Sequence, residues 1–130
     1  MKNINNLFVI DDDKIYHFLF KNLLKQNGIN ANVSFFHNGL EAIDHLKQHV
    51  NDPGTYPDLI LLDVNMPIMN GWQFLDEYTK LRDVGRLSPV YMISSSNNEV
   101  DINKAKEYKY AVKDYFLKPV CKADLDKIFV

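Results

Sequence analysis

Residues 59–63 read Leu-Ile-Leu-Leu-Asp, an apolar run that ends on a carboxylate. The run is too short for a helix, and it does not alternate between polar and apolar residues as a half-exposed strand does. Such a run is typical of a strand covered on both faces, as in a parallel sheet between helices. It predicts a buried strand over residues 59–62, with Asp63 at its carboxyl end.

Other short apolar runs lie on both sides of this one, at residues 7–10, 33–36, 90–93 and 112–117. Helices are predicted between them, one ending at Gly28, one capped by Asn38, one starting near residue 70, one over 99–110 and one over 123–129. Alternating strands and helices with right-handed crossovers form a doubly wound α/β domain with a five-stranded parallel sheet.

Helical spacing also predicts which side chains of these helices face the core. The residues expected to point inward are Ile15, Phe18, Leu19 and Leu23 in the first helix, Leu40, Ile43 and Leu46 in the second, Phe74, Leu75, Tyr78 and Leu81 in the third, and Val100, Ala105 and Tyr108 in the fourth.

Length and composition narrow the class of protein. A chain of 130 residues, 46% hydrophobic and 25% charged, is typical of one folded domain. The net charge is -2 and the basic residues are scattered, so direct DNA binding is not expected. Cys121 is the only cysteine, which excludes an internal disulfide. No signal peptide and no apolar run of about 18 residues is present, so a cytoplasmic protein without membrane association is expected.

Chemically capable side chains follow most of the predicted strands: Asp11 and Asp12, Asp63, Ser94, and Lys118. Ligands of doubly wound folds bind at this edge of the sheet. One aspartate after a strand is weak evidence, because it is often a turn former or a helix cap, and Asp13 is interpreted in that way. Three converging carboxylates are different, since each pair at about 4 Å repels by roughly 4 kcal/mol. A cation must offset that repulsion.

Mg²⁺ is the expected cation, because it prefers hard oxygen ligands and is usually held by carboxylates together with a phosphate. Zinc is not expected, because the histidines lie on other segments, and the pair His45 and His49 is interpreted as a solvated helix face. Lys118 adds a positive charge and Ser94 a hydroxyl donor. The set suits phosphoryl transfer to a carboxylate nucleophile, and Asp63, in the middle of the crevice, is the predicted acceptor.

Taken together, four motifs resemble the receiver domain of two-component response regulators: Val-Ile-Asp-Asp at 9–12, Leu-Leu-Asp-Val-Asn-Met-Pro at 61–67, Ile-Ser-Ser at 93–95 and Phe-Leu-Lys-Pro at 116–119. The resemblance covers about residues 7–129. It implies a flavodoxin-like sheet with strand order 2-1-3-4-5, and a single receiver domain over 1–130 without an effector domain.

The resemblance also implies roles for the carboxylates. Asp63 would be the phosphoacceptor. Asp12, Asp63 and the backbone carbonyl of Asn65 would bind Mg²⁺, or Mn²⁺ in its place, and Asp11 would contribute through bound water.

The phosphoryl-binding residues implied by the resemblance come from the last two strands. Lys118 would contact the phosphoryl oxygens and precede a cis bond to Pro119. Ser94, with Ser95 beside it, would be the switch hydroxyl. Tyr115 would turn inward when the hydroxyl moves, although an ordinary strand aromatic is the alternative for this residue.

The function implied is Mg²⁺-dependent acceptance of a phosphoryl group from a sensor histidine kinase or a histidine phosphotransfer protein. Such a domain is a signalling switch and not an enzyme that turns over an external substrate. Its phosphorylation would change the face formed by the fourth helix, fifth strand and fifth helix, which a protein target or a second copy of the chain would bind. The end of the first helix near Tyr16 and His17 is expected to dock the kinase, with generic helix surface as the alternative.

Two other interpretations compete. A haloacid-dehalogenase-like phosphatase would use Asp11 and Asp13 with Ser94 and Lys118, but that family has Thr or Val at the position of Ile15, and Asp63 would have no role. A degenerate receiver would bind a partner without phosphorylation, but every expected functional position is filled.

Overall fold

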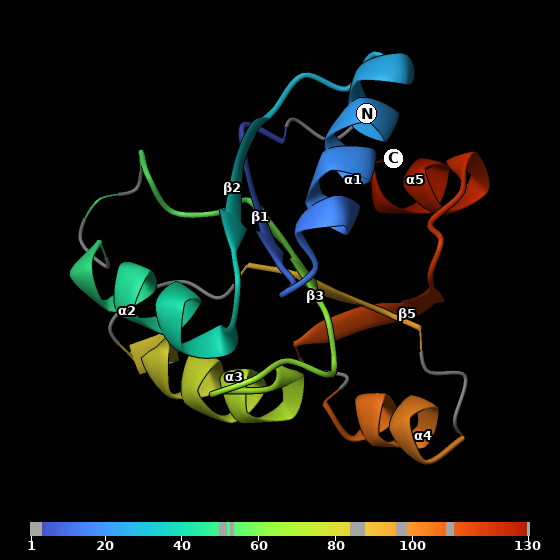
Figure 1. The fold of residues 1–130 in the computed structure, drawn as a ribbon. Helices are drawn as coiled ribbons and strands as arrows, with labels where there is room; N and C mark the ends of the chain where they lie inside the picture. Colours follow the sequence, from blue (N-terminus) through green and yellow to red (C-terminus); the bar gives the residue numbers. More distant parts are fainter. Residues whose placement is uncertain are drawn as a thin grey trace.

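The structure is a computed structural model that describes residues 4–49, 52, 54–83, 88–95, 99–108 and 111–129. Its sheet contains β1 (Asn6–Ile10), β2 (Asn32–Phe36), β3 (Leu59–Leu62), β4 (Val90–Ser94) and β5 (Val112–Leu117). All neighbouring strands are parallel and their order is β2-β1-β3-β4-β5, so the predicted flavodoxin-like topology is confirmed (Figure 1).

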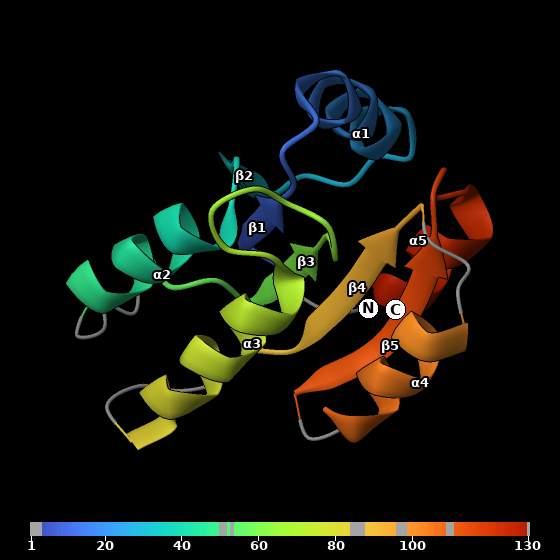
Figure 2. The ribbon, with the colours of Figure 1, turned by 60° about the horizontal axis from the view of Figure 1, so that its bottom comes forward.

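The helices are α1 (Lys14–Gln26), α2 (Gly39–Gln48), α3 (Gly71–Thr79), α4 (Glu99–Glu107) and α5 (Lys122–Ile128), with a 3-10 turn, η1 (Lys80–Asp83), after α3. Helices α1 and α5 cover one face of the sheet, and α2, α3 and α4 cover the other (Figure 2). The predicted end of α4 at residues 109–110 lies outside the described residues. Among the described residues, no helix is both long and apolar enough to cross a bilayer.

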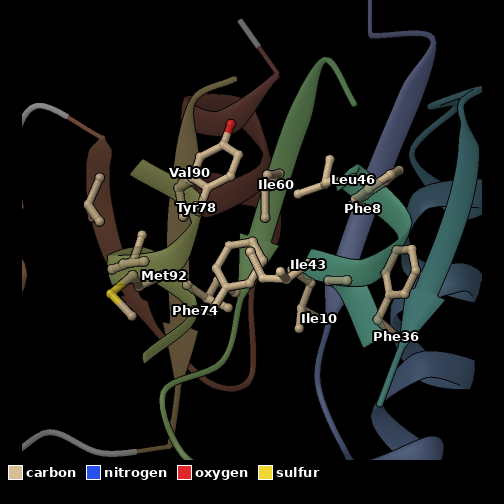
Figure 3. Packing of buried hydrophobic residues seen from close by; sticks show 14 of the residues in the cluster. Phe8, Ile10, Phe36, Ile43, Leu46, Ile60, Phe74, Tyr78, Val90 and Met92 are labelled. Carbon is tan, nitrogen blue, oxygen red and sulfur yellow. The ribbon is translucent and has the colours of Figure 1, made fainter. Parts of the chain in front are cut away.

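The core explains why the strands are uninterrupted apolar runs. Every residue of β3 and β4 is buried, and so is β1 after its first residue, because helices pack on both faces. On the α2/α3 side, Phe8, Ile60 and Met92 of the sheet face Ile43 and Phe74 of the helices (Figure 3). The central strands are thereby held rigidly, and so are the residues that follow them.

Side-chain caps set where the helices begin. The Asp13 carboxylate accepts hydrogen bonds from the backbone of Ile15 and Tyr16, which confirms its interpretation as a cap. Asn38 caps α2 in the same way, and Asn70 forms a reciprocal capping box with Gln73 at the start of α3.

The predicted inward face of α1 is wrong for three of its four residues, and only Leu23 packs, partly buried, against the core. Ile15, Phe18 and Leu19 are 72%, 66% and 56% exposed, whereas His17 and Phe20 are buried. Apolar residues surround most of this helix, so the spacing fits more than one face and only packing against the sheet selects between them. The outcome is an apolar surface on α1 that no other described element covers.

Two residues of the other helices also differ from prediction. Leu40 is exposed because Ala42, Ile43 and Leu46 form the buried face of α2, and a residue at position 40 lies to its side. Val100 is exposed because it is not at helical spacing from Ala105, the buried residue of α4. The remaining predicted residues of α2 and α3 are buried, Leu81 is buried in η1 beyond the end of α3, and Tyr108 packs partly buried against the core.

Candidate functional site

The three carboxylates converge at the carboxyl edge of the sheet. Ile10 of β1 pairs with Leu62 of β3, so the residues that follow them, Asp11 and Asp63, lie side by side. One carboxylate oxygen from each of Asp11, Asp12 and Asp63 lies within 4.8 Å of the others. Asp11 and Asp63 are only 2% and 7% exposed, whereas Asp12 is exposed. The predicted convergence is confirmed.

Lys118 reaches the same crevice from the end of β5. Its Nζ lies 2.6 Å from Asp11 Oδ2 and 3.6 Å from Asp63 Oδ2. The Lys118 backbone N–H donates to the Ser94 carbonyl oxygen at 2.9 Å, which joins the ends of β4 and β5. The peptide bond from Lys118 to Pro119 is cis, as the resemblance implied.

The surroundings of Asp63 destabilise the charged form of its carboxylate. Its Oδ1 accepts a hydrogen bond from the backbone N–H of Val64 at 2.8 Å. Burial, and then repulsion by Asp11, raise the pKa of Asp63 from 3.8 to about 7, although Lys118 and the Val64 hydrogen bond act in the opposite direction. One lysine therefore does not compensate the cluster fully, and an added cation would be stabilised there.

These residues fit a hard divalent cation. Their donors are carboxylate oxygens beside exposed positions where water can complete a coordination shell, which suits Mg²⁺ or Mn²⁺. Among the described residues this is the only group of three or more His, Cys, Asp or Glu side chains close enough to hold a metal ion. A zinc ion would prefer nitrogen or sulfur ligands, and the group of described side chains close enough to share an ion here contains neither a histidine nor a cysteine.

The pair His45 and His49 is not the solvated helix face that was predicted. Both side chains are half-buried, their rings stack with centroids 4.3 Å apart, and His45 packs against Phe8 and Phe36. Burial lowers the pKa of His45, which disfavours the charged form of the ring at this contact. Sequence spacing does not reveal this packing, because it depends on the neighbouring strands.

The other predicted residues occupy different surroundings. Ser94 is buried at the end of β4, and the next residue, Ser95, is exposed. Asn65 is exposed on the loop after β3. Tyr115 is half-buried and packs against the core on the α4 side of the sheet. Their roles in metal or phosphoryl binding stay predictions.

Sequence reasoning missed a contact made by Tyr16. Its ring centroid lies 4.4 Å from Lys118 Nζ, and its hydroxyl oxygen is buried. His17 is buried as well and stacks on Phe35. The exposed surface expected around Tyr16 and His17 is therefore made by their neighbours on α1 instead.

Comparison with family models identifies the response regulator receiver domain over residues 7–129. The chain belongs to this family. The assignment covers both the carboxylate cluster and Lys118, so every residue of the crevice lies within the receiver domain.

Solved structures similar to this receiver domain are response regulators. A two component response regulator from Cytophaga hutchinsonii is 28% identical with a TM-score of 0.86, covering 98% of this chain and 96% of that one. The Mn²⁺-bound form of Rcp1 is 28% identical with a TM-score of 0.73, covering 96% and 88%. The phosphorylated cyanobacterial phytochrome response regulator RcpA is 30% identical with a TM-score of 0.73, covering 98% and 87%.

Curated relatives are longer than the receiver domain. The probable methanogenesis regulatory protein FilR2 of Methanothrix harundinacea (strain 6Ac) is 23% identical over 93% of this chain and 76% of its own length. Regulator of RpoS of Escherichia coli (strain K12) is 30% identical over 94% of this chain, which spans only 32% of that protein. The similarity to the second protein thus concerns about a third of its length.

Gly71 places the start of α3 against the residues that follow β3. Its N–H donates to the Val64 carbonyl at 2.8 Å, and a Cβ atom here would clash with the backbone oxygen of Asp63. Because backbone cannot yield as a flexible side chain does, Gly71→Ala is expected to lower the free energy of unfolding by about 1–3 kcal/mol. Chemical denaturation measures this, with Gly54→Ala as control, since a Cβ there makes only an ordinary contact. Equal losses for both variants would contradict the close approach.

Proposed function

We propose that this receiver domain is a phosphorylation switch in which Asp63 accepts a phosphoryl group, while Asp12, Asp63 and the Asn65 carbonyl hold Mg²⁺ and Asp11 acts through bound water. The observation that carries the proposal is the joint position of Asp63 and Lys118: a buried carboxylate lies beside the Asp11/Asp12 pair and within reach of an ammonium group. Phosphoryl transfer needs chiefly this, an in-line nucleophile with positive charge around it.

In the transfer step, one bond to phosphorus forms as another breaks. A carboxylate oxygen of Asp63 forms a bond to phosphorus, the bond from phosphorus to the donor atom breaks, and its electron pair leaves with the donor. The product is an acyl phosphate on Asp63. Lys118 Nζ donates to the phosphoryl oxygens, and the Ser94 hydroxyl is the further donor. Mg²⁺, when bound, neutralises charge that develops on those oxygens.

Similar proteins support the metal and the acceptor chemistry. Rcp1 binds Mn²⁺ and RcpA is phosphorylated, and both share this fold over most of the chain at 28% and 30% identity. The dehalogenase-like alternative loses support, because Asp13, which it would need as a catalytic acid, caps α1 instead. A histidine kinase or histidine phosphotransfer protein remains the proposed donor, and the cytoplasm the proposed location.

Incubation with acetyl phosphate and Mg²⁺ tests the proposal. Intact-mass spectrometry should find one added phosphoryl group, and chelation of Mg²⁺ should prevent its addition. Lack of response to both acetyl phosphate and beryllofluoride would favour the degenerate-receiver alternative.

The donor is proposed to dock on the exposed apolar surface of α1, which begins directly beside the crevice. Ile15, Phe18 and Leu19 are the exposed residues of this surface. Phe18→Ser should slow transfer from a kinase found by profiling those of the same genome, while leaving phosphorylation by acetyl phosphate unchanged. Equal slowing with both donors would show that the substitution acts on the crevice and not on docking.

Output is proposed to occur through the face of α4, β5 and α5. A groove of about 490 Å³ lies between α4 and β5, with Ala105 and Tyr115 among its lining residues. The phosphoryl group carries roughly -1.5 to -2 charge units in place of the single charge of the carboxylate, enough to recruit Ser94 and Lys118 and to bias Tyr115. A protein target or a second copy, and not DNA, would then bind this face. Beryllofluoride should shift NMR signals of β5 and α4, and shifts confined to the loops after β1 and β3 would contradict this.

A further inference from the structure

Lys118 contacts a residue of the crevice, Tyr16, that has no role in the phosphoryl transfer proposed above. Its Nζ lies over the Tyr16 ring, 4.4 Å from the centroid, in addition to its contacts with Asp11 and Asp63. An ammonium group at this distance over an aromatic ring is attracted by the negative face of the ring. Two carboxylates and one ring therefore surround the lysine head group.

Tyr16 is itself held in place between α1 and the loop that carries Lys118. Its ring stacks on Phe20 with centroids 5.9 Å apart. It also lines a cavity of about 180 Å³ together with Pro119 and Val120, the residues that follow Lys118. The ring therefore has contacts of its own besides the one with the lysine.

The hydroxyl group of Tyr16 does not explain this placement. Its oxygen is buried, and among the described residues it has no hydrogen-bond partner. Burial, and then Asp11 and Asp63, raise the pKa of Tyr16, so the group stays neutral. A buried tyrosine hydroxyl that served a structural purpose would normally be hydrogen-bonded. The ring is the part of this side chain that contacts Lys118 and Phe20.

We propose that Tyr16 is a positioning residue for phosphoryl transfer, whose ring keeps the Lys118 ammonium group at the crevice when a divalent cation competes with it for the carboxylates. The inference rests on the proposed function. Mg²⁺ prefers oxygen ligands, so it draws on Asp11, Asp12 and Asp63 but not on an aromatic ring. The ring contact therefore persists when the ion pairs weaken, and Lys118 stays where the phosphoryl oxygens arrive.

The first test measures the position of Lys118 without any phosphorylation. Methylene protons next to Nζ that lie over a ring are shifted upfield in NMR spectra. With excess Mg²⁺, this shift should be present in the wild type, kept in Tyr16→Phe and lost in Tyr16→Leu. A wild type without the shift would overturn the proposal, and this holds even if Tyr16→Leu fails to fold.

The second test measures the initial rate of phosphorylation by acetyl phosphate with Mg²⁺. Tyr16→Leu should be about 10-fold slower, the size expected of a cation–aromatic contact, and Tyr16→Phe should remain within about twofold of the wild type. A wild-type rate in Tyr16→Leu, or equal slowing in both variants, overturns the role of the ring. A wild type that keeps the NMR shift but accepts no phosphoryl group overturns the proposed function, and with it the role in transfer, while the contact itself stands.

Discussion

Asp63→Asn is expected to lose phosphorylation by acetyl phosphate and Mg²⁺, with a fall in rate of about 100-fold or more, because the amide offers no carboxylate nucleophile. Asp11→Asn should be slower than the wild type but still labelled, since Asp11 contributes to the cation site and not to the bond with phosphorus. Radiolabel incorporation under equal Mg²⁺ measures both.

Asp44→Asn is the matched control, because Asp44 is exposed on α2, on which none of the crevice residues lies. It should be labelled like the wild type. Label that persists in Asp63→Asn but disappears in Asp11→Asn would identify Asp11 as the nucleophile and contradict the assignment of Asp63 as the acceptor.

The second large effect concerns stability in the absence of metal. The pKa of Asp63 is raised from 3.8 to about 7, so between these pH values the folded state binds a proton that the unfolded state has released. The free energy of unfolding must then fall as pH rises through this window, and the loss is complete above it. Asp63→Asn removes the free-energy cost of an ionised carboxylate at this buried position. The variant should therefore be more stable than the wild type at pH 8 by about 2–4 kcal/mol, with little difference near pH 4.

Thermal unfolding at both pH values, in a chelating buffer, measures this difference. Excess Mg²⁺ should then stabilise the wild type and not Asp63→Asn, because only a ligand of the folded state raises its melting temperature. An Asp63→Asn protein less stable than the wild type at pH 8 without metal would show that the carboxylate is already compensated. Asp44→Asn again serves as control.

The strand positions and the site could be predicted for a shared physical reason. The continuous apolar runs at 7–10 and 59–62 require strands covered on both faces, and parallel strands bring their carboxyl ends to one edge. Asp11 and Asp63 then become neighbours whatever their rotamers are. The backbone arrangement alone carries that inference, so it needed no knowledge of side-chain packing.

Features that depend on side-chain packing could not be predicted in this way. Apolar residues surround α1, so Ile15 and Phe18 were equally good candidates for the core until the sheet selected Phe20. The contact of Tyr16 with Lys118 joins the first helix to the end of the last strand, and nothing local in the sequence indicates it. The one signal in the sequence is an aromatic residue in the first turn of the helix that follows the Asp11/Asp12 pair.

A crystal structure with Mn²⁺ and beryllofluoride tests the central claim most directly. Anomalous scattering should place one Mn²⁺ ion against the carboxylates of Asp12 and Asp63, with beryllofluoride on an Asp63 oxygen and Lys118 Nζ in contact with its fluorines. Metal bound elsewhere, or an Asp63 side chain free of beryllofluoride in crystals that contain both reagents, would contradict the assignment of Asp63 as the acceptor.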